Sequence, residues 1–260
     1  MIPLEDNFAD IIGKAQCGLG LSDDALASAA GVTVAELGAV QAERFDERVV
    51  RRLAPPLRLG ADALADCAWY PAQRQLPGLT MLTTRFGATT VNAYVAHDSV
   101  RAVAFDTGAS AAPMLAFLHD RTLTLELVLL THAHSDHVGV LSRLKTRAFA
   151  SEREPVAGAE TFPDGHVFYV GALQIEARPT SGHTPGGTSY VVHGLEHIVV
   201  VTGDALFAGS MGGAPLAYEE ALRDNREQVL TLPDDTIVCP GHGPLTTVGE
   251  EKRHNPFFTA

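Results

Sequence analysis

The chain has 260 residues, of which 46% are hydrophobic and 19% charged. Such a chain can bury a core as one large domain, or as a core domain with a small appendage, and this composition excludes disorder, collagen and coiled coil. Nineteen Lys and Arg against 31 Asp and Glu give a net charge of −12. Because this charge repels nucleic-acid backbones and anionic lipid, we expect neither as a partner.

The sequence predicts a cytoplasmic protein with reduced thiols. The first residues are acidic and lack the cationic flank and apolar run of a secretory signal. No later stretch approaches the roughly 18 apolar residues of a membrane span. Cys17, Cys67 and Cys239 are odd in number and far apart, which argues against a disulfide framework and a thiolate metal site.

Residues 1–75 are expected to form a small all-helical module, because Leu, Ala and Val recur at helical spacing. Ser22 can cap one helix, and Gly31 permits a tight turn. Thr33 and Glu36 form a capping box for the next helix. This is helix-turn-helix spacing, and it resembles the small repressor-type DNA-binding domains.

The charges of this module nevertheless disfavour DNA. A recognition helix needs Arg, Lys, Asn or Gln at base edges and flanking cations at phosphates, whereas the second helix offers Val34, Ala35, Glu36 and Gly38. Residues 1–78 contain 7 Lys and Arg against 11 Asp and Glu, a balance of −4. We expect a packing or protein-contact role instead, including a homo-oligomer formed through the module.

After a linker at 69–78, residues 76–260 are expected to form an α/β domain in which helices cover sheets. Apolar runs bounded by turn residues predict strands at 79–86, 89–96, 100–106, 124–130, 167–170, 173–177, 189–193, 197–201 and 236–239. Longer-period patterns predict helices at 111–120, 138–146, 217–230 and 247–254.

Metal-type ligands are concentrated directly after the apolar run 123–130. His132, His134, Asp136 and His137 fall within six residues, with no Lys, Arg or Glu among them. In an extended segment, alternation sends His132 and His134 to the same side. The turn into the following helix lets Asp136 and His137 project to a neighbouring position, so one loop can serve two adjacent metal ions.

Further candidate ligands stand at other junctions between strands and loops. His183 and His242 are flanked by glycines, and Asp204 ends a strongly apolar strand. Imidazole and carboxylate ligands suit zinc, iron and manganese alike, and no thiolate selects among them. We expect two divalent metal ions per chain, zinc in first place and iron or manganese as alternatives.

These motifs resemble the metallo-β-lactamase superfamily, and the resemblance covers nearly all of residues 79–260. It implies a four-layer αβ/βα sandwich with the metals at one edge of two facing sheets. It also implies two ligand sets that share one bridging carboxylate: His132, His134 and His183 for the first metal, Asp136, His137 and His242 for the second, and Asp204 between them.

Within the superfamily, the chain resembles the short bacterial hydroxyacylglutathione hydrolases, or type II glyoxalases. The resembling segments are residues 182–186, 203–210, 240–250 and 254–258. One departure concerns the substrate. The branch usually continues after its Gly-Ser segment with Gly-Arg-x-Asp-Phe, whereas this chain has Met-Gly-Gly-Ala-Pro and so loses a cation that can meet an anionic substrate.

The resemblance implies a binuclear metal-dependent hydrolase of a thioester, either S-lactoylglutathione or another acyl-thiol. Asp136 and Asp204 would be catalytic, because they would orient the attacking water. Two alternatives use the same fold: a mononuclear iron persulfide dioxygenase and a lactonase. A non-enzyme alternative is a metal-dependent regulator that uses the N-terminal helices.

Three further residues are candidates for supporting roles. Asp106, at the end of a strand, is expected to lie behind the metal ligands, and Asn92 and Tyr94 are expected to line the substrate pocket. The remaining histidines are interpreted as ordinary surface or core residues: His97, His119, His166, His193, His197 and His254.

Overall fold

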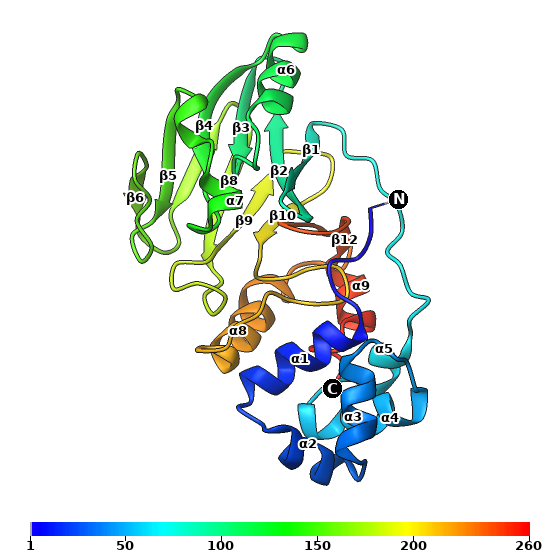
Figure 1. Ribbon diagram of the computed structural model, residues 1–260. Helices are drawn as coiled ribbons and strands as arrows, with labels where there is room; N and C mark the ends of the chain where they lie inside the picture. Colours follow the sequence, from blue (N-terminus) through cyan, green and yellow to red (C-terminus); the bar gives the residue numbers. More distant parts are fainter. Residues whose placement is uncertain (1) are drawn as a thin grey trace.

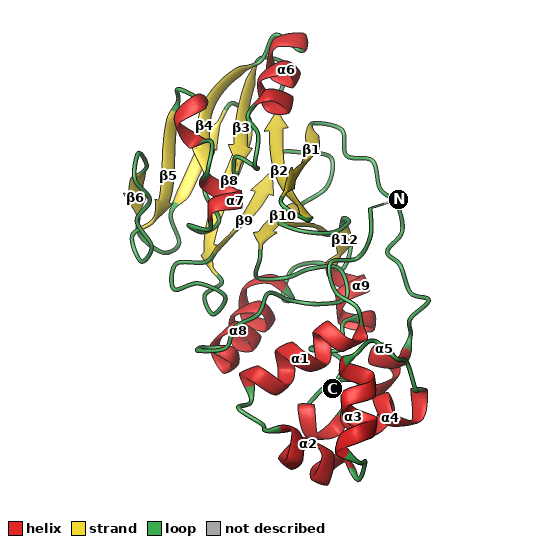
Figure 2. Ribbon diagram, viewed as in Figure 1, coloured by secondary structure: helices red, strands yellow, loops and turns green. Residues whose placement is uncertain are grey.

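A computed structural model describes residues 2–260, in which a bundle of short helices precedes two six-stranded sheets (Figure 1). Figure 2 shows the strands gathered in the upper part of the view and the N-terminal helices below them. The N-terminal helices are α1 Phe8–Gly18, α2 Asp23–Ala30, α3 Val34–Gln41, α4 Glu47–Leu53, the 3₁₀ turn Pro55–Leu57 and α5 Ala61–Ala65.

The two sheets face each other, and each is built from strands that are largely consecutive in the chain. The first has the order β1 to β6: Leu79–Phe86, Thr89–His97, Arg101–Phe105, Thr124–Leu129, Arg147–Ser151 and Glu160–Phe162. The second runs from β12 back to β7: Thr246–Thr247, Ile237–Pro240, Val199–Gly203, Thr188–His193, Leu173–Pro179 and Val167–Val170.

Helices cover the outer faces of both sheets. Met114 and Leu118 of α6 (Ala112–Asp120) pack on the first sheet. Val229 of the π turn Asn225–Val229, which extends α8 (Tyr218–Asp224), and Val248 of α9 (Val248–His254) pack on the second. A third apolar cluster, which includes Phe105 and Tyr190, fills the space between the sheets. The four-layer αβ/βα sandwich is therefore confirmed.

The nine predicted strands are all present within two residues of their predicted ends. The helix predicted over 138–146 is wrong. The chain instead forms the single turn α7 (Ser135–Val138) and the 3₁₀ turn Leu141–Arg143. Gly139 ends α7 in a tight turn, where a Cβ would lie 2.4 Å from the Ser135 carbonyl oxygen. Strands β5, β6 and β12 were not predicted.

The N-terminal helices have the predicted caps. The Ser22 hydroxyl accepts a hydrogen bond from the Ala25 N–H, Gly31 ends α2 at φ 64°, and the Thr33–Glu36 capping box starts α3. The division of the chain near residue 75 stays a prediction. Among residues 2–260, every helix is too short or too polar to span a lipid bilayer.

The core of the helical bundle extends into the second half of the chain. Leu26 and Leu37 are fully buried in a cluster that also contains Met211, Tyr218 and Phe257. Figure 1 accordingly places α1 beside α8, with the C-terminus among the N-terminal helices. The helices therefore pack on the segments that lead away from the second sheet.

Candidate metal centre

The predicted ligand residues lie together at one edge of the sandwich, because each follows the end of a strand. The loop 130–137 follows β4, His183 lies in the loop after β8, Asp204 follows β10, and His242 follows β11. Strands from both facing sheets thus deliver side chains to one place.

The first group consists of His132, His134, His183 and Asp204, whose candidate ligand atoms all lie within 4.8 Å of one another. His183 Nε2 is 3.1 Å from His134 Nδ1 and 3.5 Å from Asp204 Oδ2. His132 Nε2 is 3.9 Å from the same carboxylate oxygen. His134 is exposed, so this group faces the surface of the molecule.

The second group consists of Asp136, His137 and His242, again within 4.8 Å of one another. His242 Nε2 lies 3.5 Å from Asp136 Oδ2, and His137 Nε2 lies 3.8 Å from that oxygen. Asp204 contacts this group too, because its Oδ1 is 3.3 Å from His137 Nε2 and its Oδ2 is 3.4 Å from His242 Nε2. One carboxylate therefore joins the two groups.

The donor set fits divalent metal ions. Nitrogen and oxygen ligands bound tetrahedrally at about 2.0–2.1 Å lie roughly 3.3 Å apart, and several of these separations are close to that value. His132 Nε2, His137 Nε2 and Asp204 Oδ1 are also buried without a hydrogen-bond partner. Buried polar atoms are normally satisfied, so these three atoms point to cations as their partners.

Two of the histidines are held by backbone carbonyls behind them. The Nδ1–H of His183 donates to the Gly213 oxygen at 2.8 Å, and that of His242 donates to the Thr90 oxygen at 2.7 Å. Such contacts fix the tautomer and direct Nε2 toward a metal. The loop after Asp204 and strand β2 therefore position the ligands.

Asp106 lies behind the candidate ligands, in contact with His137 and Thr131. Its Oδ2 is 2.7 Å from His137 Nδ1 and accepts a hydrogen bond from the Thr131 hydroxyl, which lies 3.0 Å from His132 Nδ1. Asp106 has φ 57°, a backbone conformation that costs free energy for residues other than glycine and is typical of functional sites. One buried carboxylate thus orients a histidine of each group.

The electrostatics of the centre favour positive charge around Asp204. Burial would raise the pKa of the Asp204 carboxyl, but the charge of His137 holds it well below its ordinary range. Burial lowers the pKa of His242, but the hydrogen bond and charge of Asp204, together with the charge of Glu5, raise it to about 9. A divalent cation would supply the same positive charge.

The prediction that Asn92 and Tyr94 line the substrate pocket is wrong. Both side chains are buried in β2. The Asn92 amide donates to the Pro240 and Gly243 carbonyl oxygens, and the Tyr94 hydroxyl donates to the Pro240 oxygen at 2.7 Å. Because β2 faces the second sheet here, these residues hold the loop that carries His242.

Glu154, which the sequence did not indicate, joins two ligand loops. Its carboxylate accepts hydrogen bonds from the Ala133 N–H at 3.3 Å and the Gly186 N–H at 3.2 Å. The Cβ that a side chain would add at Gly186 would lie 2.3 Å from the Glu154 Cβ. The glycines after His183 therefore indicated that another segment packs closely against this loop. They did not indicate that this segment contains Glu154.

The N-terminal segment also reaches the centre, which the sequence did not indicate. Glu5 Oε2 lies 3.9 Å from His242 Nδ1. The Asp6 carboxylate pairs with Lys14 and accepts a hydrogen bond from the Ser210 hydroxyl at 2.5 Å, and Lys14 donates to the Met211 oxygen at 2.9 Å. These contacts tie α1 to the loop after Asp204.

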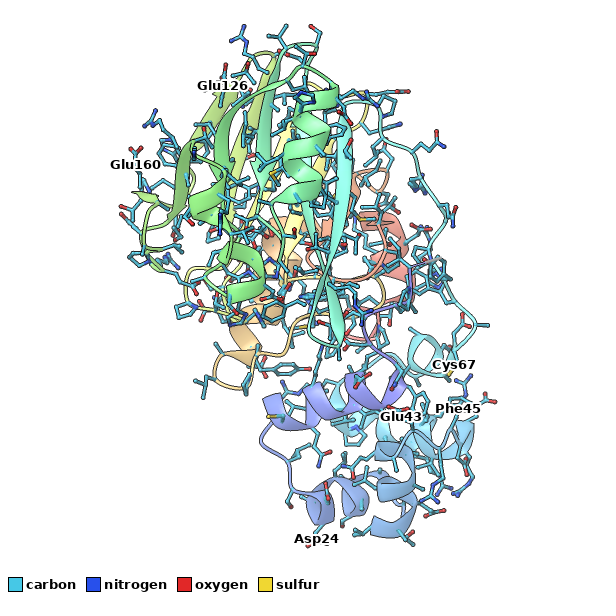
Figure 3. All side chains as sticks on the ribbon, turned by 45° about the horizontal axis from the view of Figure 1, so that its top comes forward. Asp24, Glu43, Phe45, Cys67, Glu126 and Glu160 are labelled. Carbon is cyan, nitrogen blue, oxygen red and sulfur yellow. The ribbon has the colours of Figure 1, made fainter. Side chains whose placement is uncertain are left out.

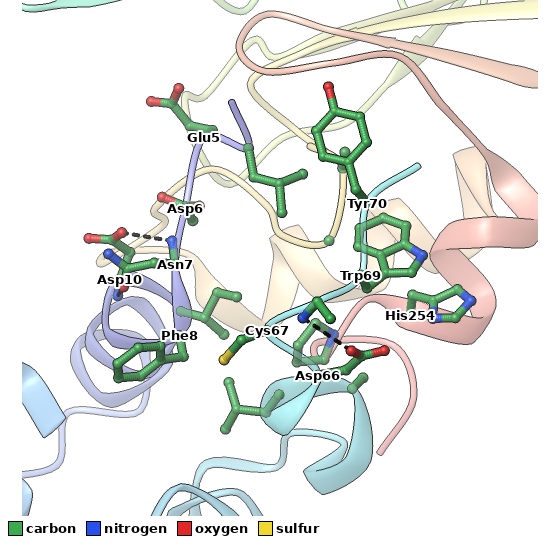
Figure 4. A pocket seen from close by; sticks show the side chains of 18 of the residues that line it. Glu5, Asp6, Asn7, Phe8, Asp10, Asp66, Cys67, Trp69, Tyr70 and His254 are labelled. Carbon is green, nitrogen blue, oxygen red and sulfur yellow. Dashed lines mark hydrogen bonds between the residues drawn. The ribbon is translucent and has the colours of Figure 1, made fainter. Parts of the chain in front are cut away.

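A cavity of about 680 Å³ lies where the N-terminal helices meet the rest of the chain. Figure 4 shows Glu5, Asp6 and Asp10 on one side of it and Trp69 and Tyr70 on the other. Among the residues that line this cavity within the described chain, four are acidic and none is Lys or Arg. An anionic ligand is therefore disfavoured here.

Comparison with known proteins identifies the family to which this architecture belongs. The model of the metallo-beta-lactamase superfamily matches residues 86–175 and 170–242. Hydroxyacylglutathione hydrolase GloC of Haemophilus influenzae is 30% identical over 192 residues, which cover 63% of this chain and 90% of that protein.

Two solved structures show the same likeness. The B3 metallo-beta-lactamase BLEG-1 is 29% identical with a TM-score of 0.60, and the match covers 70% of this chain and 100% of that one. TTHA1623 in a di-iron-bound form is 27% identical with a TM-score of 0.55, over 68% of this chain and 99% of that one.

Two facing sheets with paired histidine and aspartate sets at one edge define a metallo-hydrolase fold. The chain belongs to the metallo-β-lactamase superfamily.

Proposed function

We propose that the protein is a binuclear metal-dependent hydrolase of thioesters. The observation that carries this proposal is the contact of the Asp204 carboxylate with both ligand groups, through Oδ1 to His137 and through Oδ2 to His132, His183 and His242. The likeness to GloC supports a thioester as the substrate. Zinc suits this ligand set, and the di-iron form of TTHA1623 supports iron as the alternative.

His132, His134 and His183 would hold one metal, Asp136, His137 and His242 the other, and Asp204 both. Bound there, divalent ions would polarise the thioester carbonyl and lower the pKa of water from 15.7 toward about 7.

The chain's own groups orient the reactants. Asp136 is partly exposed beside both second-group histidines, so its carboxylate can accept a hydrogen bond from the attacking water and align it. Water adds to the carbonyl, the carbon–sulfur bond breaks, and the products are a carboxylic acid and a thiol. A thiol with a pKa near 8.5 leaves as thiolate, so the site needs no proton donor for the leaving group.

The second ligand group favours this proposal over a mononuclear persulfide dioxygenase, which would need only His132, His183 and Asp204. A lactonase would use the same residues. The test is to assay the purified holoprotein in parallel with thioesters, lactones and a β-lactam, and to follow oxygen uptake with a persulfide. We expect thioester hydrolysis to dominate; persulfide-dependent oxygen uptake without hydrolysis would contradict the proposal.

The regulator alternative is tested separately by DNA binding of the full chain at low and high salt. Asp24 and Glu43 are exposed on the outer surface of the N-terminal helices (Figure 3), and this acidic surface repels phosphates. We expect no retention of DNA. Salt-sensitive binding would support the regulator instead.

A further inference from the structure

A second cavity opens directly beside the candidate metal centre. It has a volume of about 360 Å³ and is lined by the loop 181–185, which includes His183, by the loop 215–217 and by Glu220 of α8. Since His183 belongs to the first ligand group and to the wall of this cavity, a substrate whose carbonyl reaches the metals has this cavity next to it.

The walls of this cavity are mainly apolar. Pro185, Pro215, Leu216 and Ala217 line it, and the Leu216 side chain is 99% exposed. A fully exposed leucine at the rim of a pocket leaves apolar surface that a ligand can cover. Because two of these residues are prolines, little backbone freedom is lost when a ligand binds against them.

The charges near the cavity disfavour an anionic substrate. Glu220 is its only Asp, Glu, Lys or Arg within the described chain. The Lys14 ammonium of α1 is already paired with Asp6 and donates to the Met211 oxygen. The Arg223 guanidinium lies 3.7 Å from the Glu220 carboxylate and 3.0 Å from the Asp224 carboxylate. A carrier with several carboxylates, such as glutathione, therefore finds no Lys or Arg among the described residues that line this cavity.

The cavity is held in shape from two sides. His183 Nδ1 donates to the Gly213 oxygen, just before the loop 215–217. Gly182 has φ 119°, and a Cβ there would lie 2.4 Å from the Ala221 Cβ of α8. Tyr218, which begins α8, is buried in the core of the N-terminal helices. The helical bundle thus fixes the outer wall of the cavity.

We infer that the substrate is a thioester of an uncharged, apolar acyl chain, and that this chain lies against Pro185, Pro215 and Leu216. This inference rests on the proposed thioester hydrolase function and adds its substrate class. Each methylene removed from water contributes about 0.8 kcal/mol, which corresponds to about a fourfold gain in binding per methylene.

The experiment uses the holoprotein with N-acetylcysteamine thioesters of acetic, butanoic and hexanoic acid, and S-lactoylglutathione as the anionic comparison. We expect kcat/KM to rise by about three- to fourfold per methylene until the cavity is filled. Leu216→Ser should reduce the hexanoyl-to-acetyl ratio by about fivefold or more. The control is Tyr169→Ser, a large exposed side chain that does not line this cavity and should leave the ratio unchanged.

A binding measurement separates this inference from the proposed function. Calorimetry with the non-hydrolysable S-hexyl thioether of N-acetylcysteamine should show binding that Leu216→Ser weakens and Tyr169→Ser does not. Equal kcat/KM across the series, or a preference for S-lactoylglutathione, would overturn the inference and leave the hydrolase intact. Thioether binding without hydrolysis of any thioester would overturn the hydrolase and leave the cavity assignment. No thioether binding would overturn the inference.

Discussion

The two-sheet region and the N-terminal helices contribute to this protein in different ways. Both clusters of metal-type ligands found among residues 2–260 come from loops of the two-sheet region. The helices instead supply packing around Met211 and Tyr218 and the contacts of Lys14 and Asp6 with the loop after Asp204. The candidate metal ligands thus come from one region, while the packing around them depends on both.

The largest effect is expected from Asp204→Asn, which removes the charge shared by the two ligand groups. Metal content should fall, and thioester turnover should drop by more than about a hundredfold, beyond the loss typical of a residue that only supports a ligand. Metal analysis and kinetics on the same preparation measure both. Asp24→Asn, on the exposed surface of α2, is the matched control. Unchanged turnover in Asp204→Asn would contradict the assignment.

The shared core predicts that the two regions unfold together. Leu37 is fully buried in α3, and Leu37→Ala should lower the free energy of unfolding by about 2–5 kcal/mol because it leaves a cavity. Val34→Ala, at a 48% exposed position of the same helix, should change it by less than about 0.5 kcal/mol. Denaturant titrations should show one shifted transition. Two transitions, of which only one moves, would show that the regions unfold independently.

Asp106→Asn tests whether the Asp106 carboxylate holds the His137 ring in position. The amide cannot match the negative charge that Asp106 places 2.7 Å from His137 Nδ1. Loss of such a contact typically lowers metal affinity or activity by about 10–100-fold. We therefore expect the metal affinity of the variant to fall by such a factor while the fold stays intact. Competition with a chelator measures the affinity. Wild-type affinity in the variant would mean that Asp106 does not position His137.

The smallest effect concerns Glu251, which lies in α9 away from the ligands. Burial raises its pKa to about 7 from an ordinary 4.5, although hydrogen bonds from Asn255, Thr246 and the Gly209 N–H lower it. Between these two values the folded state keeps a proton that the unfolded state has released. The free energy of unfolding therefore falls as the pH rises through this window and stays low above it.

Glu251→Gln removes this dependence and can keep the three hydrogen bonds, since the Thr246 hydroxyl can also accept one. We expect both proteins to be equally stable at pH 4.5 and the variant to be more stable at pH 8, on the order of 2 kcal/mol. Denaturant titrations at the two pH values give the difference. A variant that is less stable at pH 8 would contradict the burial of an ionisable carboxyl here.

Sequence patterns located the candidate site because its residues follow strands that are easy to identify. The run from His132 to His137 comes directly after a buried apolar strand, and the glycines around His183 and His242 indicate close backbone approach. Nine strands were predicted for the same reason. Short strands such as β6, with the sequence Glu-Thr-Phe, carry too few apolar residues to stand out.

The contacts that sequence reasoning missed are long-range. The interpretation of Asn92 and Tyr94 as pocket residues was wrong because alternation along a strand does not tell which of two faces meets the other sheet. Glu5 and Glu154 reach the ligand loops across the fold, and nothing in their local sequence shows this. Packing of whole elements, rather than local pattern, decides such contacts.

The most direct test of the account is a metal titration of the chelator-treated protein, with bound metal and thioester hydrolysis measured at each step. The central claim is that Asp204 joins two metal sites in one catalytic centre. It predicts two metal ions per chain at saturation, with hydrolysis rising fully only as the second ion binds. Full hydrolysis at one ion per chain, or saturation at one ion, would contradict it.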